Sequence, residues 1–569
     1  MESWYLYNPS LGLSNIRKIQ LSVNESIEGA LQQIEGKILK GYSARIEEVE
    51  NLIVQSYNAT DNWNQTFTPF KKVKHLYLAC NWEILAAGLL DGLDDLEGFY
   101  ITNNTYLKRI QPGLFNNKKN LKTVVVNNGT LHLELGMFRG MPNLKELDLR
   151  RNQIEELPVG LFADIPDIEK LNLSHNNIMS LSTKVFYGLP FLTELDLSWN
   201  HLEGWNDEAF SYVNMLLHLN IGNNEIKQLT PASFKKLNSL FTLNLDGNYL
   251  ENLEKDSFIG LPRLDHLSVN NNMLKEINTS TFDYVKALNV LLLEDNNITT
   301  LEPEVFHNLR KMELFRSNSN NVSKLELNSF QGFSHVTSLH LNKMEIETIE
   351  EEWCAGLHSL TELDLSENKI THLPPNAFHS AKKLSKLNLR DNLIESVDPK
   401  SFDNVCQLQY LDLSNNRLQD PPSNSYDNMS SVLTLNLSNN QIVNLKKNSL
   451  IAYRGLNDLD LSKNLIEKIA TDAFVLNKKL VNLHITFGSF QTATSWITAV
   501  SLTDGFKKTD NEYLPERLRN LANIEIDSDG VTHITIDSTS STVKSEMGSF
   551  KTEVDGIFEL KQLIKNFIY

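Results

Sequence analysis

Residues 144–154 read LKELDLRRNQI, and residues 168–178 read IEKLNLSHNNI, 24 positions further along the chain. Both stretches fit the pattern LxxLxLxxNxL, with apolar residues at positions 1, 4, 6 and 11 of a unit and asparagine at position 9. Counting from Leu144 in steps of 24 gives fifteen unit starts, the last at 480, without a one-residue slip. A fixed period of this length predicts one solenoid, in which each unit packs only on its neighbours.

The spacing inside a unit predicts a short β-strand. Positions 4 and 6 point into the core, while positions 3, 5 and 7 face the opposite way, so one strand per unit gives a parallel sheet with an exposed concave side. The asparagine at position 9 is expected to donate to and accept from peptide groups that turn inside the coil, away from water. Looser units are expected to start at Val73, Leu96 and Leu121, and fainter ones at Ile16 and Val49.

Most units also carry an aromatic residue at position 19, namely Phe162, Phe186, Phe210, Phe234, Phe258, Phe282, Phe306, Phe330, Phe378, Phe402 and Phe474. Over residues 49–490 these motifs resemble the leucine-rich repeat family, in the 24-residue form found in Toll-like receptors and extracellular adhesion proteins. The resemblance implies an α/β repeat fold, a leucine-rich-repeat solenoid shaped as a curved horseshoe with a parallel β-sheet on its concave face. It also implies a binding scaffold that serves many different ligands.

The pattern divides the chain into an irregular N-terminal cap (1–48), the solenoid (49–490), a C-terminal cap (491–542) and a terminal helix (543–569). In the C-terminal cap, Ile524 and Ile526 precede a turn that contains Gly530, and Ile534 and Ile536 follow it. This alternation predicts a hairpin that covers the last open edge of the sheet.

Apolar residues recur in steps of 4 and 3 from Val543 to Ile568, which is heptad spacing. One interpretation is a coiled-coil helix that pairs with a partner helix in a homo- or hetero-dimer. The other is a single amphipathic helix that packs back on the end of the solenoid. A solenoid followed by a coil is similar to the layout of secreted arthropod immune proteins with leucine-rich repeats.

Departures from the repeat indicate candidate binding sites. The unit that starts at Met312 has Phe315 and Ser317 where leucine is expected, and the next unit has Met344 in place of the ladder asparagine, which predicts the weakest part of the coil at 312–350. The alternative is that this unit has drifted and its register is misassigned. An apolar patch with a charged rim, typical of a protein-binding site, is expected around Val290, Leu292, Leu314, Glu294, Asp295, Arg316 and His340.

A second candidate site lies upstream, where aromatic, histidine and acidic residues are predicted on neighbouring concave positions: Trp199, Leu217, His218, Phe241, Asp265 and His266. Large rings supply contact area at a small entropic cost, so this cluster suits recognition. The Asp/Asn residues at position 5 are interpreted as a habit of the repeat and not as catalytic acids. The sequence contains no nucleophile, metal or phosphate motif, so we expect no catalytic residue, no metal and no cofactor.

The charge balance bears on partners. Lys and Arg number 53 against 71 Asp and Glu, a net charge of −18, which repels nucleic acid and anionic lipid. We therefore expect no nucleic-acid partner. No apolar run reaches the roughly 18 to 20 residues that a membrane helix needs.

The N-terminal segment, the cysteines and the sequons bear on the cellular compartment. Met1 opens a segment without the layout of a secretory signal, so the protein is either intracellular or has had a signal removed. Of the three cysteines, Cys354 and Cys406 are expected to be buried thiols, and Cys80 to be exposed. Sequons favour secretion mildly, with glycosylation candidates at Asn58, Asn64, Asn103, Asn128, Asn278, Asn297, Asn321 and Asn428.

The sequence thus predicts a non-catalytic protein that binds a protein or glycan ligand on its concave face. The expected location is extracellular or at the cell surface, with a cytoplasmic location as the alternative. Recognition in innate immunity is the first interpretation. Cell adhesion or matrix assembly and an intracellular scaffold are the other two.

Overall fold

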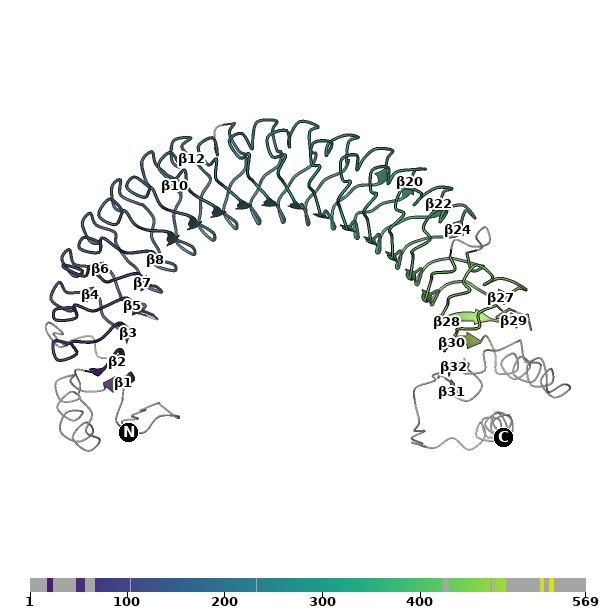
Figure 1. The fold of residues 1–569 in the computed structure, drawn as a ribbon, viewed down its shortest axis with the longest axis horizontal. Coiled ribbons are helices and arrows are strands. Elements are labelled where there is room, and N and C mark those ends of the chain that lie inside the picture. Colours follow the sequence, from purple (N-terminus) through teal and green to yellow (C-terminus); the bar gives the residue numbers. More distant parts are fainter. Residues whose placement is uncertain are drawn as a thin grey trace. The chain divides into compact units, whose positions relative to one another are not determined.

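The computed structural model describes residues 18–23, 48–56, 67–102, 104–231, 233–422, 429–470, 473–474, 476–487, 522–526 and 532–536. The chain divides into a first unit, Met1–Leu274 with Ser280–Leu288, and a second unit, Lys275–Thr279 with Asn289–Tyr569. In each unit the chain coils so that every turn contributes one strand to a sheet along the inner side of the coil (Figure 1). The described residues contain no α-helix.

In the first unit the strands of the main sheet all run parallel. They are β1 (Lys18–Val23), β2 (Asn51–Ser56), β3 (His75–Cys80), β5 (Gly98–Ile101), β7 (Thr123–Val126), β8 (Glu146–Asp148), β9 (Lys170–Asn172), β11 (Glu194–Asp196), β13 (His218–Asn220), β14 (Thr242–Asn244) and β15 (His266–Ser268). On the outer side, β4 (Ile84–Leu85) pairs with β6 (Arg109–Ile110), and β10 (Ser180–Leu181) with β12 (Gly204–Trp205). Strands β1 and β2 confirm the faint repeats that start at Ile16 and Val49.

The second unit repeats this arrangement. Its main sheet contains β16 (Val290–Leu292), β17 (Leu314–Arg316), β19 (Ser338–His340), β21 (Glu362–Asp364), β23 (Lys386–Asn388), β25 (Tyr410–Asp412), β26 (Thr434–Asn436), β28 (Asp458–Ile466) and β30 (Asn482–Phe487). Short outer strands are β18 (Lys324–Leu325), β20 (Thr348–Ile349), β22 (His372–Leu373), β24 (Ser396–Val397), β27 (Asn444–Leu445) and β29 (Lys468–Ile469).

The sheet of the second unit ends on an antiparallel hairpin. Strands β31 (Ala522–Ile526) and β32 (Thr532–Ile536) pair antiparallel, and β32 also pairs antiparallel with β30. The hairpin predicted from the isoleucine alternation is therefore confirmed, and it occupies the strand edge that would otherwise offer unpaired peptide groups. The heptad segment 543–569 lies outside the described residues.

The 24-residue register holds from strand to strand, and it sorts side chains into inward and outward rows. Leu147 lies opposite Leu171, which in turn lies opposite Leu195, and all three are buried. The position-19 aromatics fill the back of the coil in stacked pairs such as Phe186 and Phe210, whose ring centroids are 5.9 Å apart. The core is thus a continuous column of leucines beside a column of phenyl rings.

The asparagines at position 9 form the expected ladder. Asn176 Nδ2 donates to the carbonyl oxygens of Leu173 (2.8 Å) and Leu149 (3.1 Å). Its Oδ1 accepts the backbone N–H groups of Asn152 (2.8 Å) and Ile154 (3.1 Å) in the preceding turn. One amide therefore closes its own turn and joins it to its neighbour.

The Asp/Asn column at position 5 has a structural task that the sequence analysis did not identify. Asp196 Oδ1 accepts the backbone N–H and the hydroxyl of Ser198, at 2.9 and 2.6 Å. Asn172 and Asp364 make the same pair of bonds to Ser174 and Ser366. A side-chain oxygen that caps the backbone two residues later ends the strand after three residues.

The irregular turns at 312–350 keep their register. Strand β17 pairs in step with β16 and β19. Phe315 is fully buried, 5.0 Å from the ring of Phe306 and 5.1 Å from that of Phe333, and the small Ser317 beside it is buried as well. The large residue at position 4 is thus accommodated by a small one at position 6. Because β17 pairs in step with both neighbours, the alternative of a misassigned register is wrong.

Two of the three cysteine predictions need correction. Cys354 is buried as expected, and burial raises the pKa of its thiol to about 11. Cys80 is buried, because β3 is six residues long and carries position 8 inward with positions 4 and 6. Cys406 is exposed, because it follows the inward-facing Val405.

Replacing Asn176 by alanine is expected to lower the free energy of unfolding by roughly 2 kcal/mol or more, because five buried peptide groups, including the Ser174 carbonyl, lose a partner. Urea denaturation monitored by circular dichroism measures the change. The control is Asn177→Ala, the same substitution one position later, outside the ladder. Equal effects of the two substitutions would contradict the ladder as a source of stability.

Burial raises the pKa of Asp148, although the Arg150 backbone and guanidinium oppose the shift. An acid with a higher pKa in the folded than in the unfolded protein loses stability as pH rises from about 3.9 through the folded value. Asp148→Asn keeps the oxygen that accepts the Arg150 N–H. It should therefore raise the urea midpoint more at pH 7 than at pH 4, whereas exposed Asp91→Asn controls for net charge. Equal gains at both pH values would refute this.

Candidate ligand-binding surface

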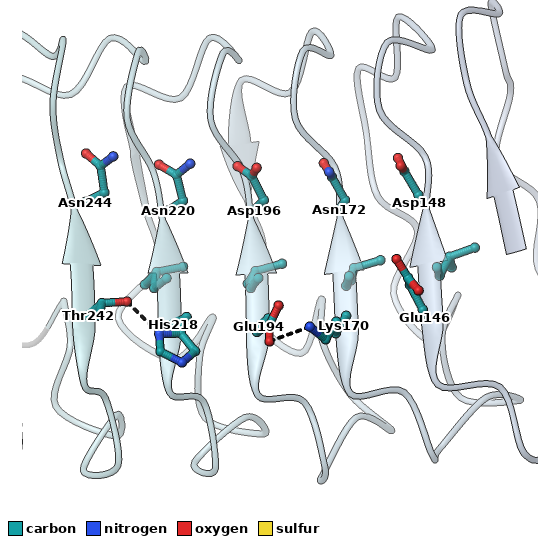
Figure 2. Close-up of a pocket in the computed structure, with 14 residues that line it drawn as sticks. Glu146, Asp148, Lys170, Asn172, Glu194, Asp196, His218, Asn220, Thr242 and Asn244 are labelled. Atoms are coloured by element: carbon teal, nitrogen blue, oxygen red, sulfur yellow. Dashed lines mark hydrogen bonds and ion pairs between the residues drawn. The ribbon is translucent and has the colours of Figure 1, made fainter. Parts of the chain in front are cut away.

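The solvent-facing side of the sheet in the first unit holds an open trough of about 560 Å³ along strands β8 to β14. Figure 2 shows two rows of side chains that line it. The position-3 row contains Glu146, Lys170, Glu194, His218 and Thr242, and the position-5 row contains Asp148, Asn172, Asp196, Asn220 and Asn244. The trough is polar throughout these two rows.

Much of this polarity is satisfied within the protein. Lys170 Nζ lies 2.7 Å from Glu194 Oε1, and this contact raises the pKa of the lysine. His218 Nδ1 and Thr242 Oγ1 are 2.8 Å apart in a hydrogen bond. Because the position-5 oxygens cap strand ends, the trough leaves few groups in need of a ligand.

The upstream aromatic cluster is brought together only in part. The ring of Phe241 lies 6.4 Å from that of His218 and 5.7 Å from that of His266, whose Nδ1 is 2.7 Å from Asp265 Oδ2. Phe241 is 42% exposed and Leu217, one turn before it, is 37% exposed. These side chains form one group beside the N-terminal ends of their strands.

Trp199 does not belong to that group. It follows the C-terminal end of β11 at a residue with φ 57°, and its ring stacks on His175 at 5.3 Å with an interplanar angle of 6°. Position 8 adopts this left-handed backbone in turn after turn, which places it at the far end of the strand from positions 2 and 3. The prediction of one cluster is therefore wrong for Trp199.

Two further exposed apolar side chains, which were not predicted, precede β11 and β13 in this part of the sheet. Phe191 and Met215 stand at position 24 of consecutive units and are 49% and 48% exposed. A lone exposed apolar residue carries little information, but apolar residues at position 24 of two successive units could have indicated an exposed apolar group.

The in-register pairing of β16, β17 and β19 places the residues of the apolar patch predicted in the second unit side by side. Val290 lies opposite Leu314 in the position-3 row, and Leu292, Arg316 and His340 follow one another in the position-5 row. All five side chains are half-buried on the solvent-facing side of β16, β17 and β19. We call these five residues the apolar patch.

The two predicted acidic residues lie at the end of β16. Glu294 is half-buried at position 7, and Asp295 is exposed at position 8 with φ 53°. They therefore border the apolar patch instead of interrupting it. His340 Nε2 hydrogen-bonds Ser338 Oγ at 2.9 Å, which ties the last member of the patch to its own strand.

Arg316 differs from the other cations on the sheet. Its guanidinium forms no ion pair with any described residue, and its buried Nε has no hydrogen-bond partner there. By contrast, Lys386 two strands further along lies 2.6 Å from Glu362. The apolar patch thus combines three aliphatic side chains with a positive charge that no residue in the described part of the chain neutralises in an ion pair.

The predicted glycosylation sites differ in exposure. Asn278, Asn297 and Asn321 are exposed and Asn128 is half-buried, whereas Asn58, Asn64, Asn103 and Asn428 lie outside the described residues. No cluster of three or more potential metal ligands is found in the described part of the chain. Among the same residues no helix has the length and apolar character that a membrane span requires.

Solved structures with the same fold include two of the Drosophila Toll–Spatzle complex. The glycosylated form matches with 21% identity over 79% of this chain and 62% of the Toll chain, at a TM-score of 0.68. The other form matches with 20% identity over 80% and 62%, at 0.63. The TLR13–ssRNA13 complex matches with 21% identity over 79% and 80%, at 0.50. At these identities the likeness concerns the fold, and this chain spans about three fifths of the Toll chains.

No curated protein matches the sequence. The family model for the leucine rich repeat matches residues 95–154, 119–178, 142–202, 200–250, 215–274, 242–293, 262–316, 317–370 and 358–418. These matches together span residues 95–418, more than half of the chain. With its ladder of asparagines and its one strand per turn, the chain belongs to the leucine-rich repeat family.

Proposed function

We propose that this chain is a non-catalytic recognition protein that binds a protein ligand on the apolar patch of the second unit. The observation that carries the proposal is the unneutralised Arg316 between half-buried Leu292 and His340. From β8 onward, the other lysines and arginines at positions 3, 5 and 7 of the described strands each contact a carboxylate, as Lys170 does with Glu194 and Lys386 does with Glu362.

The chemistry of the patch specifies a kind of ligand. An apolar side chain of a ligand that covers Val290, Leu292 and Leu314 removes apolar surface from water, which favours binding. Arg316 suits a carboxylate, which its planar guanidinium binds with two parallel hydrogen bonds. The proposed ligand therefore presents an aliphatic or aromatic side chain next to an acidic residue.

A role in immune recognition at the cell surface or outside the cell is part of this proposal. It is supported by the fold that this chain shares with Toll, whose complex with Spatzle is described as a molecular hub in Drosophila development and innate immunity. The exposed sequons at Asn278, Asn297 and Asn321 are compatible with secretion and lie away from the positions of the apolar patch.

A protein ligand is favoured over a nucleic acid. A chain with the same fold occurs in a complex with single-stranded RNA. This chain, however, has a net charge of −18, and phosphate binding depends on clustered lysines and arginines. Of the outward residues in the apolar patch only Arg316 is a fixed cation.

Reversing the charge of Arg316 tests the proposal. The immobilised full chain captures partners from its native fluid, and the affinity of a purified partner is then measured by surface plasmon resonance. Arg316→Glu and Leu292→Asp are each expected to weaken binding at least about tenfold. Arg417→Glu, an exposed arginine paired with Glu395 at 3.3 Å, is the control and should bind like the unmodified chain.

Thermal melts accompany these measurements, because Arg316→Glu removes no hydrogen bond between described residues and should leave the melting temperature unchanged. A partner that binds Arg316→Glu and Arg417→Glu equally well would refute the apolar patch as the site. A partner that proves to be RNA would refute the protein ligand.

A further inference from the structure

The sheet face at strands β2 to β7 of the first unit differs in charge from the rest of that unit. From β8 onward its outward residues include Glu146, Asp148, Arg150 and Lys170. On β2, β3, β5 and β7, positions 3, 5 and 7 carry no acidic or basic side chain other than one histidine. We call this set the neutral face, and it consists of Asn51, Ile53, Gln55, His75, Tyr77, Ala79, Gly98, Tyr100, Thr102, Thr123, Val125 and Asn127.

Two stacked tyrosines lie at the centre of the neutral face. The rings of Tyr77 and Tyr100 are 4.4 Å apart with an interplanar angle of 9°. Tyr77 is 37% exposed, and Tyr100 is half-buried, which raises the pKa of its phenol. The stack is therefore anchored on its Tyr100 side, and half-buried Ile53 of β2 lies opposite Tyr77 on its other side.

A glycine makes room for this arrangement. A Cβ atom at Gly98 would lie 2.6 Å from the Tyr100 hydroxyl and 2.6 Å from His75 Nδ1. The phenol and the imidazole thus lean over the backbone of β5, into space that any other residue would occupy. His75 Nδ1 is buried there without a hydrogen-bond partner.

We propose that the neutral face binds a neutral oligosaccharide, with one sugar ring laid against Tyr77. Sugars combine apolar C–H faces with uncharged hydroxyls, and they match an aromatic platform ringed by amide, hydroxyl and imidazole groups. Asn51, His75 and Thr123 provide such groups on three strands that flank or carry the stack.

The charges of the neutral face disfavour anionic ligands. Anionic glycans and RNA need cations to hold sulfate or phosphate. Lys74 and Lys122 are at position 2, outside the rows of the neutral face, and both contact Glu97, at 3.7 and 2.9 Å. On the β1 side, exposed Lys18 lies opposite Asn51 and is the cation that borders these rows. A site with no lysine or arginine in its rows and a single lysine at one border favours a neutral ligand.

This site is separate from the apolar patch, since it lies in the first unit and uses other residues. Its test is isothermal titration calorimetry of the full chain with laminarihexaose, chitohexaose and mannohexaose. A heparin hexasaccharide and a single-stranded RNA decamer are the anionic probes. At least one neutral hexasaccharide should bind, and saturation-transfer NMR should show its ring protons receiving saturation from aromatic protons.

Four variants locate the site. Tyr77→Ala should weaken binding of that hexasaccharide at least about tenfold, because the platform is lost. Gly98→Ala should weaken it similarly, because the new methyl group displaces Tyr100 and His75. Tyr77→Phe keeps the ring and should stay within about threefold. Tyr249→Ala, 44% exposed in the same unit but off the neutral face, is the matched control.

The proposal is overturned if no neutral hexasaccharide binds below about 5 mM, or if Tyr77→Ala and Tyr249→Ala bind alike. Tighter binding of heparin or RNA overturns it too. Arg316→Glu should bind the hexasaccharide like the unmodified chain, so failure here and failure of the apolar patch give different results.

Discussion

The turn inside each coil repeat imposes the constraint on which the structure depends. The chain must reverse there among buried leucines, where peptide groups have no water to bond. Asn176 and its equivalents solve this with one amide that donates within its own turn and accepts from the turn before. Each turn is thereby complete only beside its neighbours, which is why the architecture is a stack.

The ladder also explains why an exception is tolerated. Met344 has no side-chain amide, yet Asn368 Oδ1 in the following turn still accepts the backbone N–H groups of Met344 and Ile346 at 2.9 and 3.0 Å. The aromatic cluster of Phe306, Phe315 and Phe333 packs the adjoining turns. Buried contact on both sides therefore holds a turn whose own amide is missing.

Because inward residues maintain the coil, the outward rows are free to differ in sequence. The described zones of the sheet face differ in how many of their charged and polar groups have a partner within the protein. The trough on β8 to β14 pairs Lys170 with Glu194 and caps its strand ends with its own position-5 side chains. The apolar patch leaves a guanidinium unneutralised, and the neutral face leaves a buried imidazole nitrogen unbonded. Groups that the fold leaves unsatisfied are those from which a ligand gains most.

The sequence by itself determined the register, the burial of the leucines and the asparagine ladder, because a strict period assigns every position to a row. For the same reason it placed Val290, Leu292, Leu314 and Arg316 in one patch. The isoleucine alternation predicted the terminal hairpin. Only the tertiary structure decided what side chains do where turns depart from that period. The six-residue strand β3 turned Cys80 inward, the left-handed backbone at position 8 took Trp199 away from Phe241, and Gly98 let Tyr100 lean beneath Tyr77. Those outcomes depend on local strand length, backbone conformation and contacts between turns, which no repeat count contains.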